Sequence, residues 1–247
     1  MKGRFLSLLV PPTAWLVVFL VVPTAVLALA GFSTEGVRAL AEPVTWLLFW
    51  RSFRIAVVST ALCLAVSYPV AYYIAGCGKR WRAILLFLVV LPFWTNLLVR
   101  TYALKFCLDP LGWSSTESAV VLALVQSFLP FMILPLYSSI EKLPRRLLEA
   151  SQDLGASPAR TFWSVTVPLT LPGIAAGCIL VFIPVLGIFA LPEFIDERTP
   201  MVGSQINLYF MKNRNPGAGS ALTLILMVLT ITLTGIYSRF RKSEGLV

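Results

Sequence analysis

Residues 119–139 read AVVLALVQSFLPFMILPLYSS, a run of 21 positions without Asp, Glu, Lys or Arg. An α-helix of about 20 apolar residues spans the hydrocarbon core of a bilayer. The apolar residues are continuous rather than alternating, which favours a helix over a strand of a membrane barrel. This run therefore predicts a transmembrane helix.

Five further runs have the same character. They cover Leu6–Ala30, Ile55–Gly76, Ala83–Val99, Leu171–Leu191 and Ala218–Ser238, again without acidic or basic residues. The first run is too long for the apolar part of a signal peptide, so we expect a retained helix. The chain as a whole is 58% hydrophobic and only 13% charged, whereas soluble domains carry about 25% charged residues. These features predict an all-α membrane protein of six transmembrane helices, with residues 1–247 forming a single domain.

Prolines lie inside most of these runs, and each removes a backbone hydrogen bond from a helix. We expect kinks at several of them: Pro23, Pro69, Pro92, Pro130, Pro135 and Pro184. Membrane helices tolerate such prolines because neighbouring groups satisfy the freed carbonyls.

The basic residues of the loops predict the orientation, since Lys and Arg accumulate on the cytoplasmic side. One side, which also carries both termini, would hold 12 of the 20 Lys and Arg residues and only 4 of the 11 acidic ones. We therefore predict that both termini are cytoplasmic. This asymmetry accounts for most of the net charge of +9, which gives no reason to expect nucleic acid as a partner.

The sequence lacks the residues that several kinds of catalytic and transport chemistry require. The chain has no histidine, which excludes Ser-His and Cys-His nucleophile pairs and the zinc helix of metalloproteases. It has no Gly-x4-Gly-Lys-Ser/Thr loop for nucleotide phosphates. Its four cysteines show no metal-ligand spacing. The six runs contain no ionisable side chain of the kind that proton- or sodium-coupled carriers use. We predict a protein without catalytic or metal-binding residues, and any uphill transport would draw its energy from another subunit.

The most distinctive segment is the long cytoplasmic loop, residues 140–170. Pro144 suits the first turn of a helix, and apolar residues recur at helical spacing from Leu143 to Leu154. Gly155 follows where a left-handed C-cap is favoured. Ser157 and Pro158 then predict the start of a second helix that runs to Pro168. A basic amphipathic helix lying on lipid headgroups is the alternative interpretation.

The same loop resembles the sequence signature of ABC-importer permeases. That pattern is Glu-Ala-Ala, three residues, Gly, nine residues and Ile-x-Leu-Pro. Here Glu149, Ala150 and Ser151 begin the pattern, Gly155 keeps its place, and Val165-Thr166-Val167-Pro168 ends it. The resemblance implies the type I ABC importer permease fold. It also implies that Glu149, Ala150, Ser151 and Gly155 belong to a coupling helix that rests on an ATPase subunit.

Within that family the chain is most similar to spermidine/putrescine permeases. The segments that carry the likeness are Leu91–Asn96, Val99–Ala103, Leu129–Tyr137, Asp153–Ser157 and Phe182–Gly187. The resemblance implies a multi-pass protein of the inner membrane that imports polyamines. Ferric iron or a small organic ion is the alternative solute, and a self-sufficient channel or secondary carrier is the alternative from a different class.

Candidates for the solute path follow from the chemistry of a polyamine cation, which interacts with aromatic faces and carboxylates. Trp94 and Tyr102 are placed in or just beyond the third run, and Glu193, Asp196 and Glu197 form an acidic cluster at the predicted outer mouth. The alternative roles are helix packing or an interfacial belt for the aromatics, and a solvated loop or a docking face for the carboxylates.

The resemblance also implies the partners. They are a second permease subunit, two ATPase subunits and an extracytoplasmic solute-binding protein, all assembled on the lipid membrane. The chain itself would hold no cofactor, because ATP and magnesium would be bound by the ATPase subunits.

Overall fold

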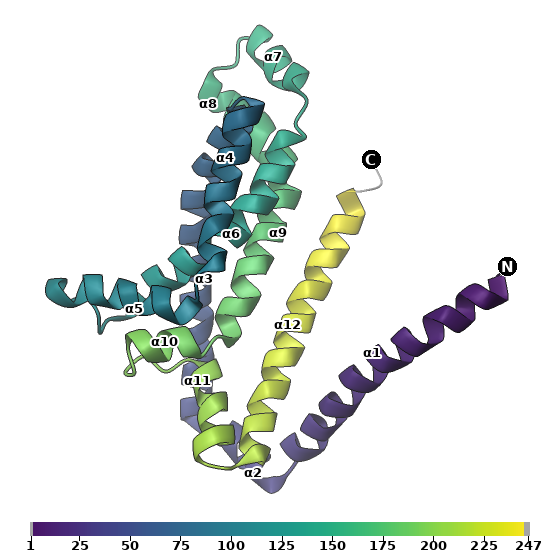
Figure 1. The fold of residues 1–247 in the computed structure, drawn as a ribbon, viewed down its shortest axis with the longest axis vertical. Coiled ribbons are helices and arrows are strands. Elements are labelled where there is room, and N and C mark those ends of the chain that lie inside the picture. The colour runs from purple at the N-terminus through teal and green to yellow at the C-terminus, as the bar shows by residue number, and fades with distance from the viewer. Residues whose placement is uncertain (1, 245–247) are drawn as a thin grey trace. The chain divides into compact units, whose positions relative to one another are not determined.

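The computed structural model describes residues 2–244, and all of the regular structure in this range is helical (Figure 1). The long helices are α1 (Lys2–Gly31), α3 (Pro43–Gly76), α6 (Glu117–Glu141), α9 (Val167–Gly187) and α12 (Pro216–Glu244). Shorter α-helices connect them: α2 (Thr34–Ala41), α4 (Lys79–Val90), α5 (Leu97–Leu108), α7 (Arg145–Asp153), α8 (Pro158–Thr161), α10 (Ala190–Ile195) and α11 (Val202–Asn207). The remaining turns are 3-10 helical at η1 (Leu91–Trp94) and η2 (Asp109–Leu111), and π-helical at η3 (Phe162–Thr166) and η4 (Leu208–Lys212).

Five helical segments within the described residues are long and apolar enough to cross a membrane, and a bent pair would make a sixth. The bent pair is Lys79–Trp94 followed by Leu97–Leu111, which meet at 94°. The sequence predicted one apolar run over Ala83–Val99 with a kink at Pro92, and the structure divides that run between α4, η1 and the start of α5. The other five predicted runs each lie within a long helix, except that α9 ends at Gly187 rather than Leu191.

Local chemistry explains the break between α4 and α5. Pro92 cannot donate a backbone hydrogen bond, and the chain tightens into η1 around it. Thr95 is then extended, and Asn96 caps α5 by accepting a hydrogen bond from the Leu98 N–H at 2.8 Å. The other five prolines expected to cause kinks lie inside continuous helices (Pro23, Pro69, Pro130, Pro135 and Pro184).

The sequence predicted that the second helix of the loop ends at Pro168, but in the structure the helix continues beyond it. It begins at Pro158 and continues through the π turn η3 into α9, so that residues 158–187 form one segment of 30 residues. In η3 the Val167 N–H donates to the Phe162 carbonyl, five residues back. This wider turn accommodates Pro168 without ending the helix.

The chain divides into two compact units, Met1–Leu48 with Gln205–Ile231, and Phe49–Ser204 with Thr232–Val247. In the first unit, α2 is capped by Ser33, whose hydroxyl accepts from the Gly36 N–H at 3.2 Å. The Thr45 hydroxyl at the start of α3 donates to the Ala39 carbonyl at 2.7 Å, and Asn215 caps α12 through the Ala218 N–H at 3.0 Å. The assignment of residues 1–247 to a single permease domain stays a prediction.

The core of the second unit is the pairing of α6 with α9. Gly173 and Gly177 permit the close approach, because a Cβ atom at Gly173 would lie 2.4 Å from the Ser139 Cβ. A Cβ atom at Gly177 would lie 2.6 Å from the Met132 sulfur. Met132 and Leu136 of α6 are fully buried at this contact face. The loop between α6 and α9 extends from one end of this helix pair, and the segment that leads into α10 follows the other end of α9.

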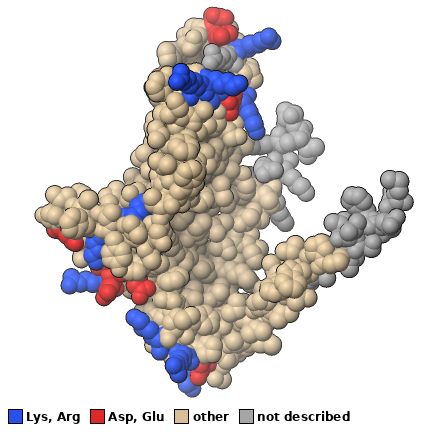
Figure 2. Space-filling view, in the orientation of Figure 1, with Lys and Arg blue, Asp and Glu red and all other residues tan. Residues whose placement is uncertain are grey.

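Charged side chains of the second unit gather at its two ends, with an uncharged surface between them (Figure 2). One end carries α7, α8 and the start of α4, and we call it the basic end; its described basic residues are Lys79, Arg80, Arg82, Lys142, Arg146 and Arg160. The opposite end carries α5 and α10. The uncharged band fits the hydrocarbon region of a bilayer, and the orientation of the chain across the membrane stays a prediction.

Candidate functional site

The loop between α6 and α9 forms the first candidate site. Helix α6 ends at Glu141, and Leu143 lies in the connection rather than in the predicted helix. Pro144 has extended backbone angles and precedes the first helical residue, so that α7 covers Arg145–Asp153. The sequence predicted the helix correctly, although it starts two residues later than the apolar spacing from Leu143 indicated.

The turn after α7 is closed by the backbone. Gly155 has φ +83°, which confirms the predicted left-handed conformation at the end of the helix. Its N–H donates to the Gln152 carbonyl at 2.8 Å, and the Ala156 N–H donates to the Ser151 carbonyl at 3.1 Å. These two bonds make a Schellman motif, which satisfies carbonyls at the helix end. Ser157 then caps α8 by accepting from the Arg160 N–H at 3.3 Å.

The predicted coupling residues face in different directions. The side chains of Glu149 and Ala150 are exposed, whereas Ser151 is half-buried and its hydroxyl lies 3.0 Å from the hydroxyl of buried Thr161. Leu154 is 89% exposed, although the sequence placed it on the apolar face. The loop therefore presents the carboxylate of Glu149 and the apolar side chain of Leu154 on a frame that the Ser151–Thr161 contact closes. Sequence reasoning missed Thr161, for which no local pattern gave a signal.

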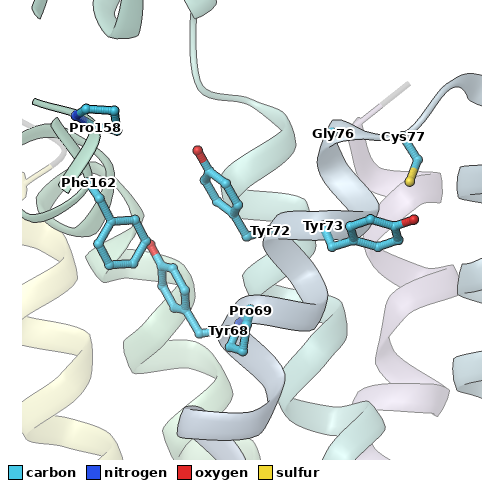
Figure 3. A pocket seen from close by; sticks show the side chains of 8 residues that line it. All are labelled: Tyr68, Pro69, Tyr72, Tyr73, Gly76, Cys77, Pro158 and Phe162. Carbon is cyan, nitrogen blue, oxygen red and sulfur yellow. The ribbon is translucent and has the colours of Figure 1, made fainter. Parts of the chain in front are cut away.

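A cavity of about 670 Å³ lies beside this loop, between the end of α3 and the start of the α8–η3 segment (Figure 3). Three tyrosines from the last turns of α3 line it with Phe162 of η3: Tyr68, Tyr72 and Tyr73. The rings of Tyr68 and Phe162 meet edge to face with centroids 5.4 Å apart, and the Tyr68 hydroxyl lies 2.9 Å from that of Thr170. These contacts tie α3 to the segment that follows the loop.

The predicted aromatic residues of the solute path are both exposed. Trp94 lies in η1 at the α4–α5 break with 74% of its surface exposed, and its ring meets that of Phe87 at 5.6 Å. Tyr102 lies in α5 and its ring packs on Phe194 of α10 at 5.2 Å. Both surfaces are therefore accessible from outside the unit, while Tyr102 also joins α5 to α10.

The three predicted carboxylates do not form one surface. Glu193 in α10 is half-buried and Glu197 is exposed, whereas Asp196 is only 6% exposed. The Asp196 carboxylate accepts hydrogen bonds from the Arg198 N–H at 3.0 Å and from the Thr199 hydroxyl. Asp196 thus closes its own loop, and Glu193 and Glu197 remain available to a solute or a protein partner.

Two ion-pair groups were not predicted. Arg51 and Arg54 of α3 both contact Glu117 at the start of α6, with Arg51 at 3.5 Å. At the basic end, Arg82 pairs with Glu141 at 2.5 Å. Each pair joins residues about sixty positions apart in the chain, so the sequence offered no local signal for either.

Residues 67–243 match the family described as binding-protein-dependent transport system inner membrane component. The chain belongs to this family. It is a multi-pass permease component of an inner-membrane ABC importer, and the matched range runs from the last turns of α3 through the loop between α6 and α9 to α12. Its relatives in the family are permease subunits rather than ATPases.

Two relatives are described as spermidine/putrescine transport system permease protein PotB. The protein of Haemophilus influenzae is 38% identical, over 93% of this chain and 91% of its own length. That of Escherichia coli K12 is 34% identical, over 94% of this chain and 96% of its own length.

Solved structures show the same fold. A bacterial ABC transporter that imports the acidic polysaccharide alginate has a chain with a TM-score of 0.71 at 15% identity, covering 96% of both chains. The MetNI methionine ABC transporter has a chain with a TM-score of 0.64 at 21% identity, covering 82% of this chain and 98% of that one. The predicted type I importer permease fold is therefore confirmed.

Proposed function

We propose that this chain conducts polyamines such as spermidine and putrescine into the cell, as one permease subunit of an ATP-driven importer. The observation that carries the proposal is the 38% identity to a spermidine/putrescine permease over 93% of the chain. The partners are a second permease subunit, two ATPase subunits and an extracytoplasmic binding protein. Both termini and the loop that holds α7 face the cytoplasm.

The geometry of the loop supports the coupling role. Helix α7 is short and exposed, and it is held between α6 and the α8–α9 segment by a backbone-closed turn and the Ser151–Thr161 contact. A rigid, exposed helix of this kind transmits a push from a docked ATPase subunit to two membrane helices at once. Glu149 and Leu154 offer that subunit a charge and an apolar contact.

The chain acts as a transport subunit without an ATPase site of its own. Its sequence lacks a phosphate-binding Gly-x4-Gly-Lys-Ser/Thr loop. ATP and magnesium are bound by the partner ATPase subunits, and this chain holds no cofactor.

The accessible side chains suit a polyamine. Such a solute carries several ammonium groups separated by methylene chains, and it loses hydration when it enters the bundle. Each cation–π contact returns about 0.5–2 kcal/mol. Trp94 and Tyr102 offer exposed aromatic faces, and Glu193 and Glu197 offer carboxylates near α5 and α10.

Reconstitution of the complete complex in proteoliposomes tests the proposal. We expect ATP-dependent uptake of radiolabelled putrescine or spermidine when the binding protein is added, and competition by unlabelled polyamine but not by ferric iron or an unrelated organic cation. ATP-dependent transport of a different solute, without polyamine uptake or competition, would overturn the substrate. Uptake by this chain without an ATPase subunit would favour a self-sufficient carrier.

Cysteine labelling tests the orientation in the cell. Gln152→Cys in α7 and Lys212→Cys in η4 both place the thiol at an exposed position. In a cysteine-free background, an impermeant thiol reagent added outside should label the second variant and reach the first only after the cells are permeabilised. Labelling of both from outside contradicts the predicted orientation.

A further inference from the structure

Arg82 holds together three helix ends at the basic end of the second unit. It lies in the first turn of α4, and its side chain is 26% exposed. Its Nη1 donates to Oε1 of Glu141, the last residue of α6, at 2.5 Å. Its Nη2 donates to the carbonyl oxygens of Ala75 at 3.0 Å and Cys77 at 3.3 Å. We call this set of contacts the Arg82 clamp.

The contacts use what is particular to an arginine. The last carbonyls of α3 have no partner within their own helix, and Ala75 lies in its final turn. The planar guanidinium offers several N–H donors in a fixed arrangement, so one side chain satisfies carbonyls and a carboxylate simultaneously. The clamp therefore fixes the α3–α4 corner against the end of α6.

The clamp lies next to the coupling helix. A cavity of about 210 Å³ is bordered by Arg82 and Glu141 on one side and by Leu143 and Leu148 on the other. Leu148 belongs to α7, and only Lys142, Leu143 and Pro144 separate Glu141 from that helix. A movement of α7 reaches α6 through this short link, and the clamp joins the end of α6 to the α3–α4 corner.

We propose that Arg82 is a positioning residue for energy coupling: the clamp makes the end of α6 and the α3–α4 corner move as one body when α7 is displaced. This inference rests on the proposed coupling role of α7. Without the clamp, the end of α6 and the α3–α4 corner remain in apolar contact but slide past each other. A displacement of α7 is then taken up by a local change near residues 142–144. ATP hydrolysis then continues while less solute crosses the membrane.

The experiment measures solute transported per ATP hydrolysed by the reconstituted complex. We expect Arg82→Gln and Glu141→Gln each to lower this ratio by at least about fivefold, the lower end of typical coupling strengths. Assembly of the complex and ATP hydrolysis should continue in both variants. Arg80→Gln is the matched control, because Arg80 is an exposed arginine two positions away, and its ratio should stay at the wild-type value.

Two further variants separate positioning from general stability. Arg82→Lys keeps the charge, but a single nitrogen replaces the fork that reaches Glu141 and both carbonyls, so the ratio should fall between those of wild type and Arg82→Gln. The double variant Arg82→Glu with Glu141→Arg restores the ion pair but not the donors to the Ala75 and Cys77 carbonyls. Its ratio should therefore exceed that of Arg82→Glu alone and stay below that of wild type. A general loss of packing would not recover in this way.

The outcomes distinguish the two proposals. If the wild-type complex shows no ATP-dependent transport, the proposed function fails. If the wild type couples transport to hydrolysis and Arg82→Gln has the same ratio as Arg80→Gln, the clamp has no positioning role. A ratio in the exchanged double variant that is no higher than that of Arg82→Glu alone also overturns the inference, since the carboxylate–guanidinium pair would then not carry the effect.

Discussion

The turn after α7 and the loop after α10 both connect short helices, yet they use their polar groups in opposite ways. Backbone bonds close the first, through Gly155 and Ala156 to carbonyls of α7. A side chain closes the second, because buried Asp196 accepts from the Arg198 N–H and the Thr199 hydroxyl. The second loop is also fixed to α3, where the Val202 N–H donates to the Ser52 hydroxyl at 2.7 Å.

This difference decides whether the loop closes without using a carboxylate that a partner could contact. A backbone-closed turn leaves Glu149 and Leu154 exposed, so they are available for docking. In the loop after α10, the Asp196 carboxylate is hydrogen-bonded within the loop and is not available to a solute. Substitutions in the first loop should therefore affect transport, while substitution of Asp196 should first affect stability.

The largest expected effect is that of Gly155→Val. A Cβ atom at this position meets no neighbour within 4 Å, so the cost is backbone strain at φ +83° rather than a clash. A left-handed conformation costs a side-chain-bearing residue about 1–2 kcal/mol, and the turn that orients α7 should rearrange. We expect polyamine uptake to be abolished while the protein remains in the membrane. Gly155→Asn is the control, because Asn tolerates this conformation. If the Val variant takes up polyamine as fast as the Asn variant and wild type do, the assignment of the coupling turn is refuted.

Asp196→Ala should have the next largest effect, on stability. Removing the carboxylate leaves the Arg198 N–H and the Thr199 hydroxyl without their acceptor, at a cost of about 1–3 kcal/mol. Thermal unfolding of the purified protein in detergent should show a lower midpoint. Glu197→Ala, at an exposed position of the same loop, should change stability by no more than about 0.5 kcal/mol. If the two variants unfold at the same temperature, the loop is not closed by Asp196.

Trp94→Ala should separate transport from stability. The side chain is 74% exposed, so we expect little change in the unfolding temperature. Loss of one cation–π contact of about 0.5–2 kcal/mol corresponds to a fall of about 2- to 30-fold in kcat/KM for spermidine uptake. Trp94→Phe should retain much of the activity, since it keeps an aromatic face. Unchanged uptake by the Ala variant would remove Trp94 from the solute path.

Ser151→Ala should have the smallest effect. It removes the contact with the Thr161 hydroxyl, and a single neutral hydrogen bond contributes about 0.5–1.5 kcal/mol. The change also restores the alanine that is commonest at this position of the coupling signature. We expect a slightly lower unfolding temperature with uptake close to wild type. Loss of uptake would mean that the hydroxyl itself, rather than the frame of the loop, takes part in coupling.

The sequence predicted most of the fold because its strongest signals are local. Five of the six apolar runs lie within long helices, and Gly155 and Ser157 adopt the turn and cap that their residue types favour. In the third run the kink expected at Pro92 is a complete break of the helix, which an average over apolar residues does not register. The signals for it were present, since Pro92 cannot continue the hydrogen-bond pattern and Asn96 is a good N-cap.

The candidate site was predicted less completely. The exposure of Glu149 follows from its place on a short surface helix, but the burial of Asp196 depends on how its loop packs in the folded unit. The Arg82–Glu141 pair joins residues that lie 59 positions apart. No spacing rule connects them, because the contact forms only where the ends of α3 and α6 meet the start of α4.

By itself the sequence determined that the chain is a helical membrane protein with a helix, a left-handed glycine turn and a second helix in its long loop, because apolar runs, helix caps and such glycines act through neighbouring residues. Only the tertiary structure decided which polar groups are free. Asp196 is used within its own loop, Ser151 is used on Thr161, and Arg82 is used on three helix ends. The physical reason is that a buried polar group must find a partner, and the partner is supplied by whichever segment the fold brings beside it.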